Sequence, residues 1–219
     1  MQIIWRGQSF FEIGVKNNGG ETKIVTDPFE PDFVGLKFPK TEADIVVISH
    51  NHKDHSNSKA IGGNPFIIDT PGEYEIKDVF IKGIPAFHDN NNGKERGQVI
   101  MFTIMAEGMK IVFLSDLGQK ELSSQQVDDL GNVDILLIPV GGAYTITAKD
   151  AAEIISQIEP GIVIPMHYKI PGLKVELDDV SKFLKEMGSE AIEPLPKIKI
   201  TPKDLPSKDD EMKIILLAP

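Results

Sequence analysis

The sequence contains no cysteine. Without thiols the chain can form no disulfide, and a bound metal must take its ligands from imidazole nitrogens and carboxylate oxygens. Basic residues are also in the minority, since 23 lysines and arginines stand against 33 aspartates and glutamates, for a formal net charge of −10. An acidic surface disfavours general attraction to nucleic acids and to anionic membranes. Nucleic acid is therefore not an expected partner.

Long apolar runs are missing as well. No stretch is long enough to span a bilayer, and the segment 1–7 (MQIIWRG) lacks the basic-then-apolar pattern of a secretory signal. We therefore expect a cytoplasmic protein with no membrane span. A length of 219 residues and an ordinary composition are typical of one globular domain, which we expect to cover residues 1–219.

Histidine is scarce, and three of the five histidines lie in the stretch HNHKDH at residues 50–55. This stretch follows the run 44–49 (DIVVIS), which is apolar and β-branched as in a buried strand. If the strand continues to residue 52, His50 and His52 point to the same side, because side chains in a strand alternate. Asp54 and His55, which end the stretch, can reach a second metal position beside the first, so the stretch can provide ligands for two metal ions.

Three more candidate ligands each follow an apolar, strand-like run: His88, Asp116 and His167. Each has an ordinary alternative. A lone histidine after a strand is more often a hydrogen-bonded structural residue, and Asp116 before Gly118 fits a simple turn. The whole set, in which the 50–55 motif is followed by three later candidates that each close a strand-like run, favours a metal centre over these alternatives.

The motif H-x-H-x-D-H at the end of a buried strand resembles the signature of the metallo-β-lactamase superfamily. This resemblance implies an α/β (α+β) fold, a four-layer αββα sandwich of two sheets faced by helices. It also implies two divalent metal ions, with zinc as the first expectation and manganese or iron as alternatives. The seven implied ligands are His50, His52 and His88 for one ion, Asp54, His55 and His167 for the second, and Asp116 as a bridge between them.

The expected activity is hydrolysis. Two divalent ions about 3.5 to 4 Å apart can turn a water into hydroxide near neutral pH. The missing cysteine disfavours the β-lactamases that use a thiolate ligand, and the motif looks more like the branch of the ascorbate-6-phosphate lactonases. We expect a small ester, lactone or phosphodiester as substrate. The alternatives are a nuclease acting on RNA or DNA and a non-catalytic metal-binding scaffold, and a homo-oligomer is left open.

All five histidines are assigned to metal, so the proton for the leaving group must come from another source. The candidates are a metal-bound water, Asp54 and Tyr144, and the last two are our candidate catalytic residues. Candidate substrate-binding residues are Gly142, Tyr144 and Asp89. Gly142 allows close approach of a substrate or simply a tight turn, and Tyr144 offers a hydroxyl or packs as an ordinary aromatic. Asp89 begins a polar loop that is either a substrate lip or the end of a mobile hairpin.

Three further expectations concern the surroundings of the motif. Members of the lactonase type usually carry histidine after the glycine of the first turn, where this chain has Gln8. The segment 27–31 (DPFEP) is predicted to be a surface connection that only rims the site. A short helix is expected from Ser56 to near Gly63, with its positive end toward the metal loop.

The remaining pattern is rich in strands up to residue 116 and alternates strands with helices after it. The turn 17–20 (NNGG) predicts a hairpin. Capping-box spacing predicts helices that begin at Ser123 and at Thr147, and a third helical face ends near Gly188.

Overall fold

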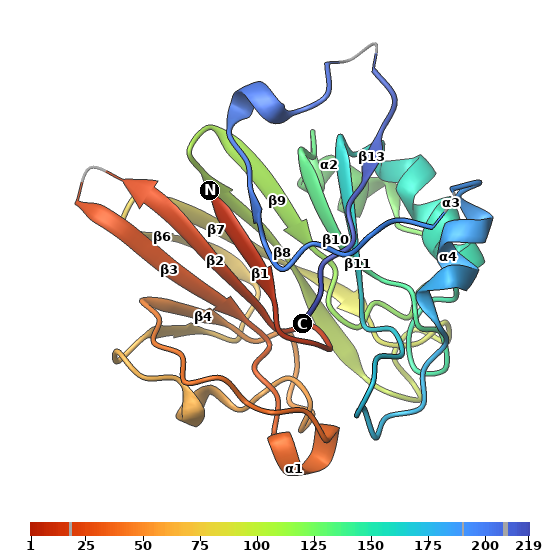
Figure 1. Cartoon of the computed structure of the whole chain (residues 1–219), viewed down its shortest axis with the longest axis horizontal. Helices are drawn as coiled ribbons and strands as arrows, with labels where there is room; N and C mark the ends of the chain where they lie inside the picture. The colour runs from red at the N-terminus through yellow and green to blue at the C-terminus, as the bar shows by residue number, and fades with distance from the viewer. Residues whose placement is uncertain (18, 190, 208–209) are drawn as a thin grey trace.

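Two mixed β-sheets pack face to face in the computed structural model, which describes residues 1–17, 19–189, 191–207 and 210–219 (Figure 1). The first sheet has the order β12 (Ile198–Lys199), β1 (Gln2–Trp5), β2 (Phe11–Asn17), β3 (Gly20–Thr26), β4 (Ile45–Val47) and β5 (Phe66–Ile68). The second has the order β13 (Lys213–Ile214), β11 (Ile162–Met166), β10 (Ile135–Pro139), β9 (Met109–Phe113), β8 (Gln98–Ala106), β7 (Val79–Phe87) and β6 (Gly72–Ile76).

The burial of each strand follows its sequence. Strands β1 and β2 alternate buried and partly exposed residues, as expected where one face meets the core. Strands β10 and β11 are apolar and buried at every position, because the opposite sheet covers one face and helices cover the other. Between the sheets lies one continuous core, whose largest side chains include Trp5, Phe11, Phe102 and Phe113.

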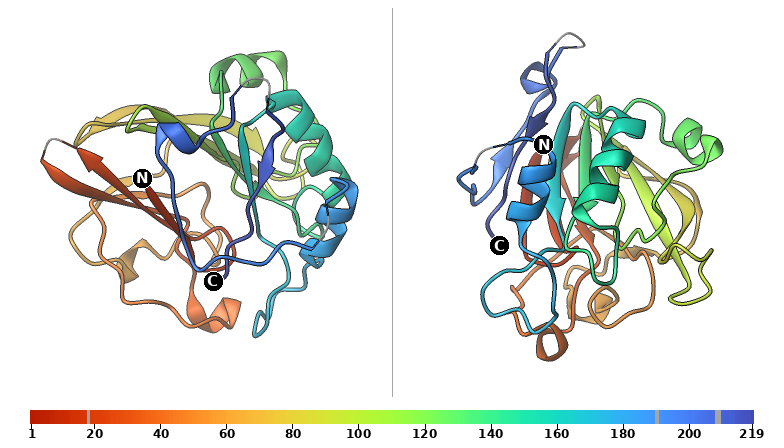
Figure 2. Two further views of the ribbon diagram at one scale, coloured as in Figure 1. Left: turned by 45° about the horizontal axis from the view of Figure 1, so that its top comes forward. Right: turned by 90° about the vertical axis from the view of Figure 1, so that its right-hand side faces the viewer.

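Helices α2 (Ser124–Leu130), α3 (Ala148–Ile158) and α4 (Val180–Glu186) flank the second sheet, and the right-hand view of Figure 2 shows α3 and α4 in front of its strands. The capping boxes predicted at Ser123 and Thr147 are both present. Helix α3 buries Ala151, Ile154 and Ile155 against the core, so its predicted apolar face is confirmed. The sandwich with flanking helices agrees with the fold expected from the motif.

The outer face of the first sheet has a thinner cover. Side chains of β3 and β4 on this face pack under the segment between the two strands, which contains the short helix α1 (Pro31–Val34). Phe10, Phe29 and Phe38 pack ring against ring here, with centroids 5.4 to 5.7 Å apart. The predicted surface connection 27–31 is therefore wrong in its first half, because Asp27, Pro28 and Phe29 are buried.

The short helix expected after the histidine motif is confirmed only in part. The structure has only a single 3-10 turn, η1 (Ser58–Ala60), whose N-cap residue makes no side-chain capping bond. So short a turn has no run of aligned peptide dipoles to direct at the metal loop. The hairpin predicted at 17–20 is supported by the pairing of Asn17 with Gly20, and Asn18 lies outside the described residues.

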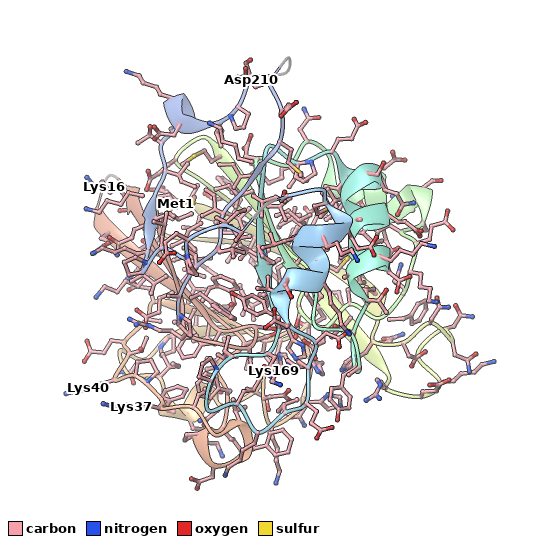
Figure 3. All side chains as sticks on the ribbon, turned by 45° about the vertical axis from the view of Figure 1, so that its right-hand side comes forward. Met1, Lys16, Lys37, Lys40, Lys169 and Asp210 are labelled. Carbon is pink, nitrogen blue, oxygen red and sulfur yellow. The ribbon has the colours of Figure 1, made fainter. Side chains whose placement is uncertain are left out.

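Charged side chains such as Lys16, Lys40 and Asp210 project from the surface (Figure 3). In the described part of the chain, no helix is both long and apolar enough to cross a membrane.

Strand direction explains where the functional residues gather. Strands β1, β3 and β4 run parallel to one another in the first sheet, as do β7, β9 and β11 in the second. The carboxyl ends of parallel strands meet at one edge of a sheet, which is where α/β sheets bind ligands. These ends deliver Gln8, Asp27 and the 50–55 stretch from one sheet, and His88, Asp116 and His167 from the other.

Candidate metal centre

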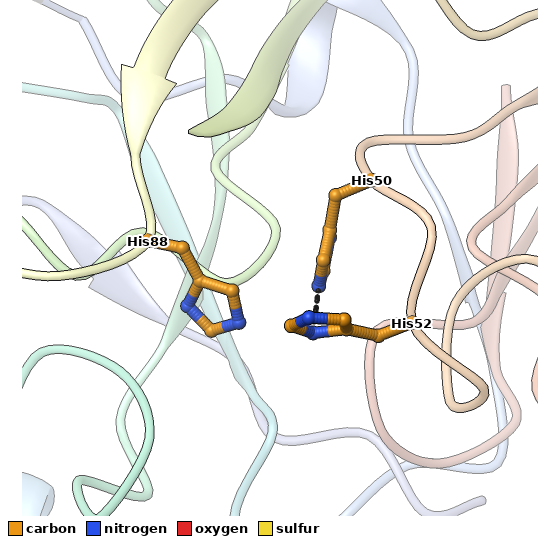
Figure 4. A group of neighbouring side chains, drawn as sticks. All are labelled: His50, His52 and His88. Atoms are coloured by element: carbon orange, nitrogen blue, oxygen red, sulfur yellow. Dashed lines mark hydrogen bonds between the residues drawn. The ribbon is translucent and has the colours of Figure 1, made fainter. Parts of the chain in front are cut away.

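His50, His52 and His88 form one cluster, in which one nitrogen from each ring lies within 4.8 Å of the others (Figure 4). His50 and His52 come from the loop after β4, and His88 reaches in from the end of β7. The Nε2 atom of His50 lies 2.9 Å from Nδ1 of His52. The rings thus direct nitrogens at a shared point.

Asp54, His55, Asp116 and His167 form a second cluster within the same distance limit. Asp116 connects the two clusters. Its Oδ2 atom lies 3.1 Å from Nε2 of His55 and 3.4 Å from Nε2 of His167, and it lies 3.6 Å from Nε2 of His88 in the first cluster. The structure therefore brings together all seven residues proposed as ligands, with Asp116 in the second cluster, and a third possible group joins Asp27 to His50 and His55.

Asp27 is a central residue of the site that sequence analysis missed. It is fully buried, and its Oδ2 atom lies 3.0 Å from Nδ1 of His55 and accepts hydrogen bonds from the hydroxyls of Ser49 (2.6 Å) and Ser115 (2.5 Å). Its Oδ1 atom accepts the backbone N–H of Ser49 at 2.7 Å. Because its oxygens are engaged in this way, Asp27 holds the ring of His55 in place while the opposite nitrogen of that ring faces the cluster.

Gln8 lies behind the second cluster, at the position where the resemblance led us to expect histidine. Its side chain is fully buried, and Nε2 donates to Asp54 Oδ2 at 3.3 Å and lies 3.3 Å from Nε2 of His167. The next residue, Ser9, donates its hydroxyl to Asp116 Oδ1 at 3.3 Å. The first turn of the chain thus supports both carboxylates of the second cluster.

Four residues at the strand ends adopt the left-handed backbone conformation that non-glycine residues rarely use. They are Gln8 (φ 49°), Asp27 (φ 36°), Ser115 (φ 47°) and His167 (φ 51°). Such conformations cost about 1 to 3 kcal/mol each and persist where surrounding contacts require them. Their clustering at one edge of the sandwich marks this edge as functional.

Two glycines allow the ligand loops to pack closely. A Cβ on Gly118 would lie 2.3 Å from the carbonyl carbon and oxygen of His88, and one on Gly141 would lie 2.0 Å from the carbonyl oxygen of His167. Any side chain at either position would displace the backbone that carries a histidine. The close backbone approach is therefore made by Gly141 to His167, whereas Gly142, the expected substrate-binding glycine, lies beside Asp178.

The electrostatics of the cluster keep His50 neutral and Asp116 ionised, as metal binding requires, whereas they favour the protonated form of His55 until a metal ion replaces that proton. Burial, together with the neighbouring His55, lowers the pKa of His50 to about 2, so its ring stays neutral. Burial alone would raise the pKa of Asp116, but His167 and His55 lower it below its ordinary value, so the carboxylate stays ionised. Burial would lower the pKa of His55, but the charges of Asp116 and Asp54 raise it well above its ordinary value.

The donor set fits divalent metal ions. In the described part of the chain, buried His55 Nε2 lies 3.1 Å from Asp116 Oδ2 and 3.3 Å from Asp54 Oδ2 but makes no well-aligned hydrogen bond, while the other ring nitrogen is held by Asp27. A buried polar atom left unpaired costs free energy that a bound cation would recover. Neutral imidazoles and ionised carboxylates are ligands that suit zinc, manganese and iron.

A cleft of about 680 Å³ opens over the cluster and is lined by His52, Asp54, His88, Asp116 and Tyr144, among others. Its volume is typical of sites for small molecules. Tyr144 is 40% exposed and faces this cleft, as a substrate-binding or catalytic residue requires. Gly142 is not among the described residues that line it.

Asp89 has a different place from the one expected for a substrate ligand. Its two carboxylate oxygens accept four backbone N–H groups of its own loop, from Asn91, Gly93, Glu95 and Arg96, at 2.7 to 3.0 Å. Burial alone would raise the pKa of Asp89, but these four bonds together lower it to about 2. Asp89 is absent from the described lining of the metal cleft, so it organises the loop 89–97 instead of facing the ligands.

Comparison with known families identifies the chain. The model of the β-lactamase superfamily domain (Lactamase_B_3) matches residues 2–167. The chain belongs to the metallo-β-lactamase superfamily. The match covers every strand that delivers a proposed ligand and ends at His167.

Relatives within the superfamily cover most of the chain. A UPF0173 metal-dependent hydrolase of Thermoplasma volcanium is 30% identical over 199 residues, which are 77% of this chain and 83% of the relative. A crystal structure from Thermotoga maritima, described as a candidate zinc-dependent hydrolase of the superfamily, is 35% identical with a TM-score of 0.77, and the match covers 99% of this chain and 97% of that one.

A more distant structure, an isothiocyanate hydrolase from bacteria of the Delia radicum gut, has a TM-score of 0.65 over 92% of this chain and 99% of that one. At 14% identity this likeness shows the fold alone. The metallo-β-lactamase fold expected from the sequence is confirmed, and the chain falls in the UPF0173 family of the superfamily.

Proposed function

We propose that the protein is a hydrolase that uses two divalent metal ions, zinc in the first place, to cleave a small ester, lactone or phosphodiester. The observation that supports this most is the position of Asp116, whose Oδ2 atom lies within 3.6 Å of histidines from both clusters. A carboxylate so placed is suited to hold two cations at a fixed separation. The relatives named as metal-dependent hydrolases agree with this proposal.

A pair of divalent ions at such a site, when bound, supplies a water activated for attack and neutralises charge that develops on the group under attack. The chain supplies the rest. His50, His52 and His88 would hold one ion, and Asp54, His55 and His167 the other. Asp27 fixes the orientation of the His55 ring, and the cleft admits a small substrate to the cluster.

Tyr144 is our candidate for the residue that gives a proton to the leaving group, with Asp54 as the alternative. Both line the cleft, and the histidines are engaged in the clusters. If Tyr144 is the donor, Tyr144→Phe slows substrates with poor leaving groups most, because activated leaving groups depart without a proton. An equal effect on nitrophenyl and alkyl esters would remove this assignment.

The function itself is tested by turnover on a panel of lactones, thioesters, carboxylic esters and phosphodiesters. We expect the zinc-loaded protein to hydrolyse at least one class and to lose that activity on chelation and regain it with zinc. Absence of turnover across the panel by fully loaded protein would instead favour a metal-binding scaffold. The small size of the cleft and the acidic net charge of the chain argue against a nuclease. Activity on RNA or DNA alone would overturn this conclusion.

A further inference from the structure

Outside the proposed metal ligands, basic residues outnumber acidic ones in the lining of the cleft over the metal centre, in contrast to the whole molecule. The chain has a formal net charge of −10, yet the cleft is lined by Lys53, Arg96 and Lys174 against a single acidic residue, Glu176, outside the proposed ligands. Within the described residues, neither Lys53 nor Arg96 has a carboxylate oxygen within 4.0 Å of its side-chain nitrogens. Lys174 donates to the backbone carbonyl of Asp32 at 3.0 Å, which positions its ammonium without neutralising it.

Arg96 lies over an aromatic ring that lines the same cleft. The carbon at the centre of its guanidinium lies 4.8 Å from the centroid of the Tyr144 ring. Stacking of this kind uses the flat face of the guanidinium and leaves the N–H donors at its edge available. Those donors form a planar fork that matches the oxygens of a carboxylate or a phosphate.

The backbone around Arg96 is fixed to the metal centre by Asp89. This residue follows His88 directly, and its carboxylate accepts the backbone N–H of Arg96 at 2.8 Å and of Glu95 at 3.0 Å. The loop that starts at a proposed metal ligand is thereby folded back, so that Arg96 returns to the same cleft. The four hydrogen bonds of the Asp89 carboxylate to its own loop thus fix the backbone position of Arg96, although Asp89 itself does not line the cleft.

From these contacts we propose that Arg96, assisted by Lys53 and Lys174, binds an anionic group of the substrate, so that the substrate is a small carboxylate or phosphate compound. The proposal rests on the proposed function for the reaction that follows, but the anion site can be tested by binding alone. The basic side chains of the cleft also attract a negatively charged substrate, which raises its local concentration there.

The test is calorimetric titration of zinc-loaded protein with two stable anions, phenylphosphonate and benzoate. Arg96→Gln should raise the dissociation constant of at least one of them by about ten- to one-hundred-fold, as expected for loss of hydrogen bonds to a charged group. Arg96→Lys should give a smaller increase, because it keeps the charge and loses the fork. Response to phenylphosphonate alone identifies a phosphate group, and response to benzoate alone a carboxylate.

Lys94→Gln is the matched control. Lys94 lies in the same loop, is exposed, and is not among the described residues that line the cleft, so the same change of charge should leave both dissociation constants unchanged. Zinc content and melting temperature equal to wild type will show that Arg96→Gln is folded and loaded. If this folded variant binds both anions as tightly as wild type, the anion site is wrong.

The two proposals fail separately. If no substrate of the panel is hydrolysed while Arg96→Gln still weakens anion binding, the hydrolase function fails and the anion site stands. If turnover is found and both anions bind to Arg96→Gln as to wild type, the function stands and the anion site fails.

Discussion

Replacement of Asp27 by asparagine should weaken metal binding although Asp27 is not one of the proposed ligands. The change conserves size but puts an amide NH₂ where a carboxylate now accepts from the hydroxyls of Ser49 and Ser115 and lies 3.0 Å from Nδ1 of His55. An amide nitrogen cannot accept a hydrogen bond. The His55 ring then loses the partner that fixes its orientation.

The magnitude follows from this network. Loss of a carboxylate that orients a metal-bound histidine typically costs 10- to 100-fold in metal affinity, so we expect a loss of about that size for zinc. Folding should suffer as well, because each buried donor left unpaired costs about 1 to 3 kcal/mol. At least one donor loses its acceptor here, so the free energy of unfolding of the metal-free protein should fall by about 1 to 3 kcal/mol.

The assay is competition for zinc between the protein and a chromogenic chelator, with urea unfolding of the metal-free protein beside it. Asp44→Asn is the control, because Asp44 also accepts a backbone N–H, from Lys23 at 2.8 Å, but lies outside the metal clusters. The control should bind zinc like wild type. Zinc affinity of Asp27→Asn equal to wild type would refute the argument that Asp27 acts through His55.

Three further predictions concern other parts of the structure. Gly141→Ala should displace the His167 backbone, because the new Cβ would lie 2.0 Å from the carbonyl oxygen of His167. We expect the free energy of unfolding to fall by about 1 to 3 kcal/mol and the zinc content to fall as well. An unchanged free energy of unfolding and an unchanged zinc content would contradict the packing argument. Asp116→Ala should lower metal content by at least one ion per chain, as measured by elemental analysis, and full content would exclude the bridging role. Burial opposes the shift, but the backbone N–H of Lys23 and the Lys77 ammonium lower the pKa of Asp44 below 3.8. Asp44→Asn should therefore lower the free energy of unfolding by about 1 kcal/mol near pH 7. The difference from wild type should keep its full size above pH 3.8 and vanish as the pH falls through the lower pKa of Asp44 in the folded state. A difference in urea unfolding that stays constant with pH would refute this.

The positions of the proposed ligands could be predicted from the sequence because they lie at or soon after the ends of strand-like runs, whereas their division into two groups was what the family resemblance implied. His88 and His167 follow directly on the last residue of a strand, and His50 comes soon after one. Parallel strands bring such ends together whatever the details of packing. The predicted helices were right for the same reason, since the capping boxes at Ser123 and Thr147 depend on residues three apart.

The roles of Asp27 and Asp89 depend on contacts that no local rule encodes. Asp27 meets Ser115 across 88 positions of sequence, and an aspartate before proline is an ordinary turn signal. One signal was present, because Asp27 follows the strand-like run 22–26 just as His88 and His167 follow theirs. Asp89 was taken for a substrate ligand because its loop is polar, whereas its carboxylate is satisfied by the backbone of that loop.

The number of metal ions per chain tests the central claim most directly. Protein freed of metal, incubated with excess zinc and passed through a desalting column should contain two zinc ions per chain by elemental analysis, and the same ratio should be reached with manganese or iron if zinc is withheld. The proposal that each of the two clusters next to Asp116 Oδ2 holds one ion predicts this ratio. A reproducible ratio of one for every metal would contradict the account, because a single ion would leave one of the clusters without a function.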